Sequence, residues 1–409
     1  GKLYVEQDNS RDALNIFYQS LTIAKQISNA SQLATCLRLL ATSYSNVSEY
    51  DKAEKYFQQC IEISKQMNSL LEEGKTRNSL GRMYSTQQNY SKAIAEHQRA
   101  LNIYQQIENK RDEALTIENI GSILHSQQLY QEAVAHFEQA ILLHREMDDD
   151  ELLVSVLEKL AKTQVSLQEA DAAIATYQQA LQISQQQDFT TVEGNLTLQL
   201  GLLYQQCSNA DQALKLFQQS LILNRQIGNR YNESLSLENI GLLFIKTGEY
   251  QRSVSYIQQA LQVSFHIGTK DYEEQLLINL DNLFSETPAS QQDLLSESLP
   301  ELIECYDINY PSASGIFRGL LAVLFAEKGE FEKGISLLVI AEQQLRPHPV
   351  AHSIFLCRKA RIYKLSNQPT EAQEALRKAV SIIPASTNNE MLEKRLQETA
   401  ILLSTSLVN

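Results

Sequence analysis

The chain has 409 residues, of which 43% are hydrophobic and 21% charged, enough for a large buried core in a folded protein. The formal net charge of −14 disfavours nucleic acid as the main partner. No apolar run approaches the about 18 residues that span a membrane, so no membrane partner is expected. The five cysteines share no spacing, which favours reduced thiols and a cytoplasmic protein.

A pattern of small and aromatic residues returns every 40 residues, as from Gly81 to Gly121 and from Gly201 to Gly241. A second set of columns follows each of these glycines, with an alanine or serine, an aromatic or large residue and another small residue. The clearest members of this set are Ala53, Phe57 and Cys60; Ala133, Phe137 and Ala140; and Ala213, Phe217 and Ser220. Such a period predicts a repeat protein.

The columns predict that each repeat is a pair of packed amphipathic helices. Glycine inside a helix costs about 1 kcal/mol relative to alanine, so a glycine that recurs at one position implies close helix packing there. We therefore expect the recurring glycines to be buried where paired helices cross. No proline occurs before Pro288, which favours long helices in every repeat up to that point.

The columns resemble the tetratricopeptide repeat, whose pattern is L-G-x2-Y, then A-x3-F, then a closing proline. The segments Glu118-Asn119-Ile120-Gly121 and Glu238-Asn239-Ile240-Gly241 are similar to the 40-residue repeats of Leu-Gly-Asn-rich polarity adaptors, rapsyn and bacterial regulatory proteins. The resemblance implies an all-α, right-handed superhelical solenoid of antiparallel helix pairs. It indicates the fold more strongly than the function, because these arrays bind unrelated partners.

The sequence predicts three segments in chain order. Residues 1–284 form the regular array, whose first repeat is expected to be truncated because Gly1 and Tyr4 already occupy repeat columns. A degenerate first repeat is the alternative. Residues 285–315, with Pro288 and Pro300 among many serines, predict an irregular joint. Residues 316–409 predict two further repeats spaced 38 residues apart, from Ala322 to Ala360, and a capping helix from 389 to about 404.

The search for catalytic chemistry finds weak patterns. Gly74-Lys75-Thr76 resembles the end of a phosphate-binding loop, but Ser69 stands where that loop requires glycine. His348 and His352 have the spacing of metal ligands on a helix but lack a third ligand. No catalytic residue, metal site or cofactor is therefore expected, and the protein is predicted not to be an enzyme.

By the geometry of the resembling family, the first helix of each repeat lines a concave groove. The candidate groove residues are Arg38, Lys75, Asn78, Arg82, Glu118, Asn119, Lys162, Leu202, Gln205, Asn239, Leu242 and Ile245. Their character changes from basic and polar to partly apolar along the chain. This gradient is either drift among solvated residues or the imprint of a bound peptide or helix with one acidic and one apolar end.

Two binding modes of the resembling families can be compared with these positions. The partner-holding asparagine of the polarity adaptors is present at Asn119 and Asn239, but Leu39 and Ser79 occupy the same position in other repeats. The two-carboxylate clamp for chaperone tails would need lysine and asparagine where Arg38 and Thr42 stand. Neither mode is complete in this chain.

The preferred function is a non-enzymatic protein interaction scaffold, part of a larger regulatory protein, that binds a protein or peptide in its groove. The alternative is a sensor or autoinhibitory arm of a signalling NTPase or caspase-like protease, whose ligand is another domain of the same polypeptide. A third interpretation is a catalytic subunit with its active residues in 285–409. The sequence identifies neither the partner nor the oligomeric state.

Overall fold

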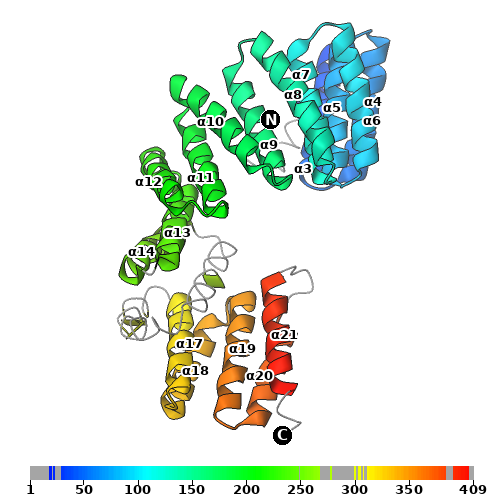
Figure 1. Cartoon of the computed structure of the whole chain (residues 1–409). Helices are drawn as coiled ribbons and strands as arrows, with labels where there is room; N and C mark the ends of the chain where they lie inside the picture. The colour runs from blue at the N-terminus through cyan, green and yellow to red at the C-terminus, as the bar shows by residue number, and fades with distance from the viewer. Residues whose placement is uncertain are drawn as a thin grey trace. The chain divides into compact units, whose positions relative to one another are not determined.

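The structure, a computed structural model, describes residues 29–247, 249–267, 311–383 and 390–404, with isolated residues at 18–20, 22–23, 277–278, 299–300, 303–304 and 307. Within this described part every regular element is an α-helix (Figure 1). The helices belong to two compact units, an N-terminal unit of residues 1–196 and a C-terminal unit of residues 197–409. Each unit is considered by itself. The predicted truncation at Gly1 and Tyr4 lies outside the described residues.

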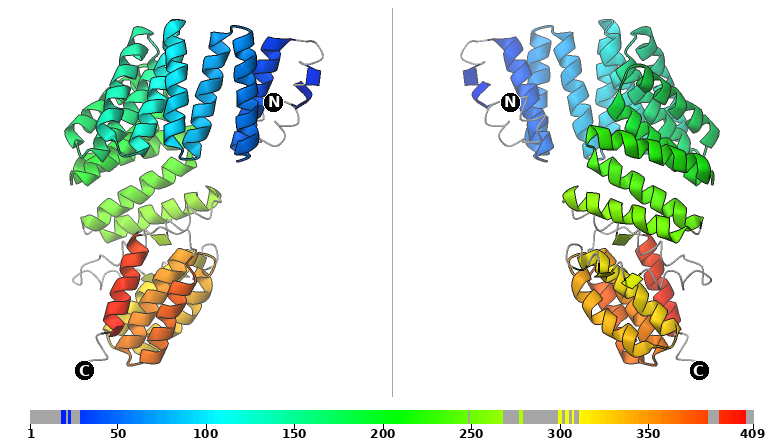
Figure 2. Two further views of the ribbon diagram at one scale, coloured as in Figure 1. Left: turned by 90° about the vertical axis from the view of Figure 1, so that its right-hand side faces the viewer. Right: turned by 90° about the vertical axis from the view of Figure 1, so that its left-hand side faces the viewer.

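The N-terminal unit consists of helices that start 20 residues apart, at Tyr50, Leu70, Tyr90 and so on (Figure 2). Their bounds are α3 Ala30–Asn46, α4 Tyr50–Gln66, α5 Leu70–Thr86, α6 Tyr90–Gln106, α7 Lys110–Ser126, α8 Tyr130–Glu146, α9 Asp150–Ser166 and α10 Ala170–Gln186, and α11 Thr190–Gln206 follows across the unit boundary. Odd-numbered helices are the first helices of their repeats and even-numbered ones the second. Each first helix packs against its own second helix and also contacts the next first helix.

A three-residue turn of constant geometry separates consecutive helices. After α7, the Gln128 N–H donates to the His125 carbonyl and the Leu129 N–H to the Leu124 carbonyl, both at 2.9 Å. This pattern is a Schellman motif, in which the middle residue adopts a left-handed conformation, here with φ of 62° at Gln128. Two 17-residue helices with their turns account for the 40-residue period.

The recurring glycines lie at the crossing of paired helices, as predicted. A β-carbon at Gly121 would come within 2.9 Å of the Phe137 ring, and one at Gly201 within 2.7 Å of the Phe217 ring. At Gly81 the partner is His97, which occupies the aromatic column of its repeat. The prediction that these glycines are buried at helix crossings is confirmed.

The C-terminal unit continues the register and then changes it. The helices that keep the 40-residue period are α12 Ala210–Ile227, α13 Arg230–Lys246 and α14 Tyr250–Ile267. The later helices are α17 Pro311–Glu327, α18 Phe331–Leu345, α19 Pro349–Leu365, α20 Pro369–Ser381 and α21 Glu390–Ser404. Three of them begin with proline, which fits the first turn because it has no N–H to leave unpaired. The offset between Pro311 and Pro349 matches the predicted 38-residue spacing, and α21 coincides with the predicted terminal helix.

The all-α solenoid of antiparallel helix pairs expected from the sequence is confirmed. The boundaries predicted at residues 284 and 315 remain predictions, because much of the proposed joint lies outside the described residues. Asp307, at the edge of this segment, is held by Arg318 of α17, whose Nη1 and Nη2 donate to the two carboxylate oxygens at 2.6 and 2.7 Å. Arg318 lowers the pKa of Asp307 well below its ordinary range, assisted by hydrogen bonds from Gln344 and Ser314.

Candidate functional site

The candidate groove residues fall in both units, so the structure describes them as two separate sets. In the N-terminal unit they lie on α3, α5, α7 and α9, on the surface that we call the first-helix face. We define this face by the partly or fully exposed inner positions of these helices, represented by Arg38, Lys75, Arg82, Asn119 and Lys162. The polar residues of this face differ in whether the protein already satisfies them.

Arg38 is engaged by a neighbouring first helix. Its Nε lies 2.7 Å from Glu72 Oε1, and the two side chains are only 19% and 17% exposed. The pair joins α3 to α5. A ligand carboxylate would have to displace Glu72 to reach the Arg38 guanidinium.

Asn78 is also engaged, at the junction of three helices. Its Nδ2 donates to Thr116 of α7 at 3.1 Å, and its Oδ1 accepts from Nδ1 of His97 on α6. The His97 Nε2 is buried and makes no hydrogen bond. Burial, with a smaller contribution from the charge of Arg82, lowers the pKa of His97 to about 4. His97 therefore stays neutral, and Asn78 keeps both of its partners.

Glu118 was expected on the open groove surface, but its side chain is only 2% exposed. His144 Nε2 donates to one carboxylate oxygen at 2.7 Å, and Lys159 Nζ donates to the other at 2.6 Å. These contacts join α7, α8 and α9, so the carboxylate serves the packing of two repeats. Sequence reasoning missed both partners. One signal was present, since the equivalents of His144 in the neighbouring repeats are Tyr104 and Ser184.

Four predicted residues of the first-helix face remain accessible. Arg82 is exposed and Lys75 is partly exposed, and neither forms an ion pair among the described residues. Asn119 is partly exposed on the adjacent α7. Lys162 contacts Glu158 of its own helix at 2.6 Å, but its side chain is 49% exposed. Such pairs contribute about 0.5 kcal/mol or less, so Lys162 can exchange Glu158 for a ligand anion.

The predicted groove residues of the C-terminal unit are mostly apolar and packed. Leu202 is partly buried against the cluster that contains Leu198 and Leu237. Leu242 packs against the core cluster that contains Phe317 and Leu320 of α17, so replacing it with aspartate would disturb this core. The two polar residues differ: Gln205 is partly exposed, whereas Asn239 is 9% exposed and donates to the Leu235 carbonyl at 2.8 Å. The side chain of Ile245 lies outside the described part of the structure.

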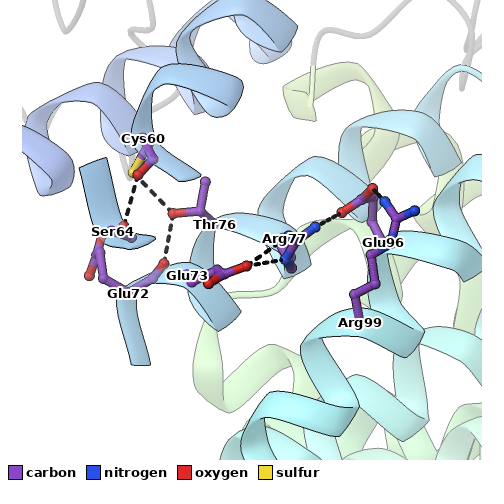
Figure 3. A network of polar contacts seen from close by, with 8 residues as sticks. All are labelled: Cys60, Ser64, Glu72, Glu73, Thr76, Arg77, Glu96 and Arg99. Atoms are coloured by element: carbon purple, nitrogen blue, oxygen red, sulfur yellow. Dashed lines mark hydrogen bonds and ion pairs between the residues drawn. The ribbon is translucent and has the colours of Figure 1, made fainter. Parts of the chain in front are cut away.

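A polar network beside the first-helix face has a structural role (Figure 3). Arg77 of α5 binds Glu73 through Nε and Nη2 and binds Glu96 of α6 through Nη1, at distances of 2.7 to 2.9 Å. Arg99 makes a further ion pair with Glu96. The charges are fully matched, so the network stabilises the α5 and α6 pair without offering an unpaired charge to a ligand.

The described residues show no alternative site of obvious chemistry. Cys60 contacts the Thr76 hydroxyl at 3.1 Å within the core, and burial raises the pKa of its thiol, which disfavours the reactive thiolate. No group of three or more potential metal ligands occurs in the described segments. In these same segments, no helix combines the length and apolar character needed to cross a bilayer.

Comparisons with known proteins agree with this architecture. A tetratricopeptide repeat family model matches residues 1–66, 112–186 and 193–264, and two further tetratricopeptide models match residues 75–112 and 355–386. No curated protein sequence matches the chain.

Solved structures share the fold at low sequence identity. The apo form of RapI is 14% identical, with a TM-score of 0.55 over 82% of this chain and 97% of that chain. Aspartyl phosphate phosphatase F from Bacillus subtilis is 13% identical, with a TM-score of 0.53 over 82% and 94% of the two chains. BtubC from P. vanneervenii is 15% identical, with a TM-score of 0.50 over 54% and 92%. The repeat columns, the paired helices and the family matches together show that this chain belongs to the tetratricopeptide repeat family.

Proposed function

We propose that this protein interaction scaffold binds a protein or peptide along the first-helix face of its N-terminal unit, without catalysing a reaction. One observation carries the proposal. Lys75 and Arg82 present positive charge on α5 with no intramolecular anion bound, whereas Arg38, Asn78 and Glu118 on the same array are all satisfied by neighbouring helices.

The charge of these residues indicates what the face can recognise. A hydrogen bond between a cationic side chain and a carboxylate contributes about 1.5–3 kcal/mol when it is partly desolvated. Two such contacts can hold the acidic part of a ligand. Asn119 can add hydrogen bonds to the ligand backbone, since a side-chain amide both donates and accepts.

The ligand can belong to another molecule or to another domain of the same polypeptide. The second case is the alternative function of a sensor or autoinhibitory arm of a signalling NTPase or caspase-like protease. We further propose a cytoplasmic location, which is supported by the free thiols of Cys36, Cys60, Cys207 and Cys357.

A random peptide library offers a direct test. Peptides selected on the immobilised whole chain should bind the Lys75→Ala/Arg82→Ala double variant about 100-fold more weakly, because two charge-assisted contacts are lost. Arg145→Ala is the matched control, since Arg145 is an exposed cation on a second helix, α8. If the selected peptides bind the double variant as tightly as the unmodified chain, the proposal is wrong.

A further inference from the structure

Three residues of the first-helix face form a row across successive repeats. Arg82, Ser122 and Lys162 each lie 12 residues after the first residue of their helix, counted from Leu70, Lys110 and Asp150. They therefore occupy the same level on α5, α7 and α9. The equivalent residue of α3 is Thr42, so the two cations have a defined position within the row.

The three helices that carry this row are directly adjacent. α5 contacts α7, and α7 contacts α9. Asn78 bonds Thr116 between the first two helices, and His125 Nδ1 donates to Thr163 at 3.0 Å between the second two. Axes of packed helices lie about 8–10 Å apart, so two such steps separate Arg82 from Lys162 by about 16–20 Å.

The middle of the row is small and already satisfied. The Ser122 hydroxyl donates to the Glu118 carbonyl of its own helix at 2.9 Å. It therefore offers neither charge nor bulk between the two cations. A chain that crosses the helices at this level meets a positive group, then a small neutral one, then a second positive group.

This spacing distinguishes between conformations of a ligand. An extended chain rises about 3.3 Å per residue and covers 16–20 Å in five or six residues. A helix rises 1.5 Å per residue and needs about 11–13 residues for the same distance. The row thus converts a geometric separation into a requirement on the sequence of the ligand.

We propose that the row of Arg82, Ser122 and Lys162 recognises an extended acidic segment with two carboxylate side chains five or six positions apart and a small neutral residue between them. One carboxylate binds Arg82, and the other displaces Glu158 from Lys162. This inference rests on the proposed function and specifies the partner class of the same face.

Designed peptides test the spacing. Fluorescein-labelled peptides of identical composition carry two aspartates separated by three, six or twelve positions in a neutral Gly/Ser/Ala background, and fluorescence anisotropy measures their binding to the whole chain at low salt. We expect the six-residue spacing to bind about 10-fold more tightly than the three-residue spacing, because a single contact then becomes two. Arg82→Ala and Lys162→Ala should each remove this advantage, and Arg145→Ala should not.

Charge reversal makes the assignment residue-specific. Arg82→Glu should bind poorly to the six-residue peptide and regain affinity when one of the two aspartates, and not the other, is replaced by lysine. Equal binding at all spacings, preference for the twelve-residue spacing of a helical ligand, absence of binding, or unchanged binding by Arg82→Ala and Lys162→Ala would each overturn the inference. Peptides that bind irrespective of spacing but still require Lys75 and Arg82 would leave the proposed function intact. The library selection above tests that function independently.

Discussion

His97 occupies the column that Phe57, Phe137 and Phe217 fill in other repeats, and it places an ionisable ring in the packed core. The ring has one hydrogen-bond partner, Asn78, which suits the neutral form with a single N–H. A second proton on Nε2 would find no acceptor in the core. This is the physical reason for the lowered pKa.

We predict that His97 makes folding sensitive to acid between pH 6.5 and 4. Its pKa falls from 6.5 in the unfolded chain to about 4 in the fold, so the unfolded state binds the extra proton in this window. Stability is therefore highest above pH 6.5 and decreases as the pH falls, by about 3 kcal/mol in all. His97→Phe should remove this component, as shown by urea unfolding at pH 7 and pH 4.5. His136→Phe on the surface of α8 is the control, and an equal pH response in both variants would contradict the prediction.

Gly201 illustrates how tightly the repeated columns are packed. A β-carbon there would lie 2.7 Å from the Phe217 ring, which is fully buried and has no space to move. We predict that Gly201→Leu destabilises the protein by about 1–3 kcal/mol or more through overpacking. Thermal unfolding beside Ala135→Leu, an exposed position on α8, measures the effect. Superimposable melting curves for Gly201→Leu and the unmodified chain would refute the packing argument.

At the scale of the element, the turns repeat as regularly as the helices. The left-handed position holds non-glycine residues such as Asn68, Gln88 and Gln128, and glycine appears there at Gly228 with φ of 72°. Residues with a β-carbon lose about 1–2 kcal/mol in this conformation, whereas glycine does not. The turns therefore carry strain that the helix packing outweighs.

Two adjacent glutamines allow a matched test of this strain. Gln128 has φ of 62°, and Gln127 before it has φ of −84°, although both are exposed. Gln128→Gly should raise the free energy of unfolding by about 0.5–1 kcal/mol, and Gln127→Gly should lower it, because only the first position needs the left-handed conformation. Denaturant unfolding of the two variants gives the answer. A decrease for both would show that the turn is not strained.

At the scale of the whole molecule, the repeat register and the contact pattern divide the chain differently. The compact units meet between Leu196 and Thr197, inside the continuous helix α11. The sequence instead predicts a joint at 285–315, where prolines first occur and the columns are lost at Asp293 and Glu297.

Limited proteolysis can locate the accessible connection. We predict that the first cut falls within 285–315, because α11 keeps its backbone hydrogen-bonded and buries Leu198 and Leu200. Mass spectrometry of the earliest fragments identifies the site. Full protection of 285–315, with cleavage confined to other turns, would favour one uninterrupted array.

The sequence by itself determined the all-α fold, the helix pairing and the buried glycines, because a 40-residue period places small and aromatic residues at the same packing positions in every repeat. It also indicated which positions belong to the first helices. It could not show which polar residues were already engaged. Glu118 is buried because His144 and Lys159 approach it from two other helices, and Arg38 is neutralised by Glu72 of the next repeat. Only the tertiary structure decides such pairings, since they depend on which side chains from separate helices come within hydrogen-bonding distance.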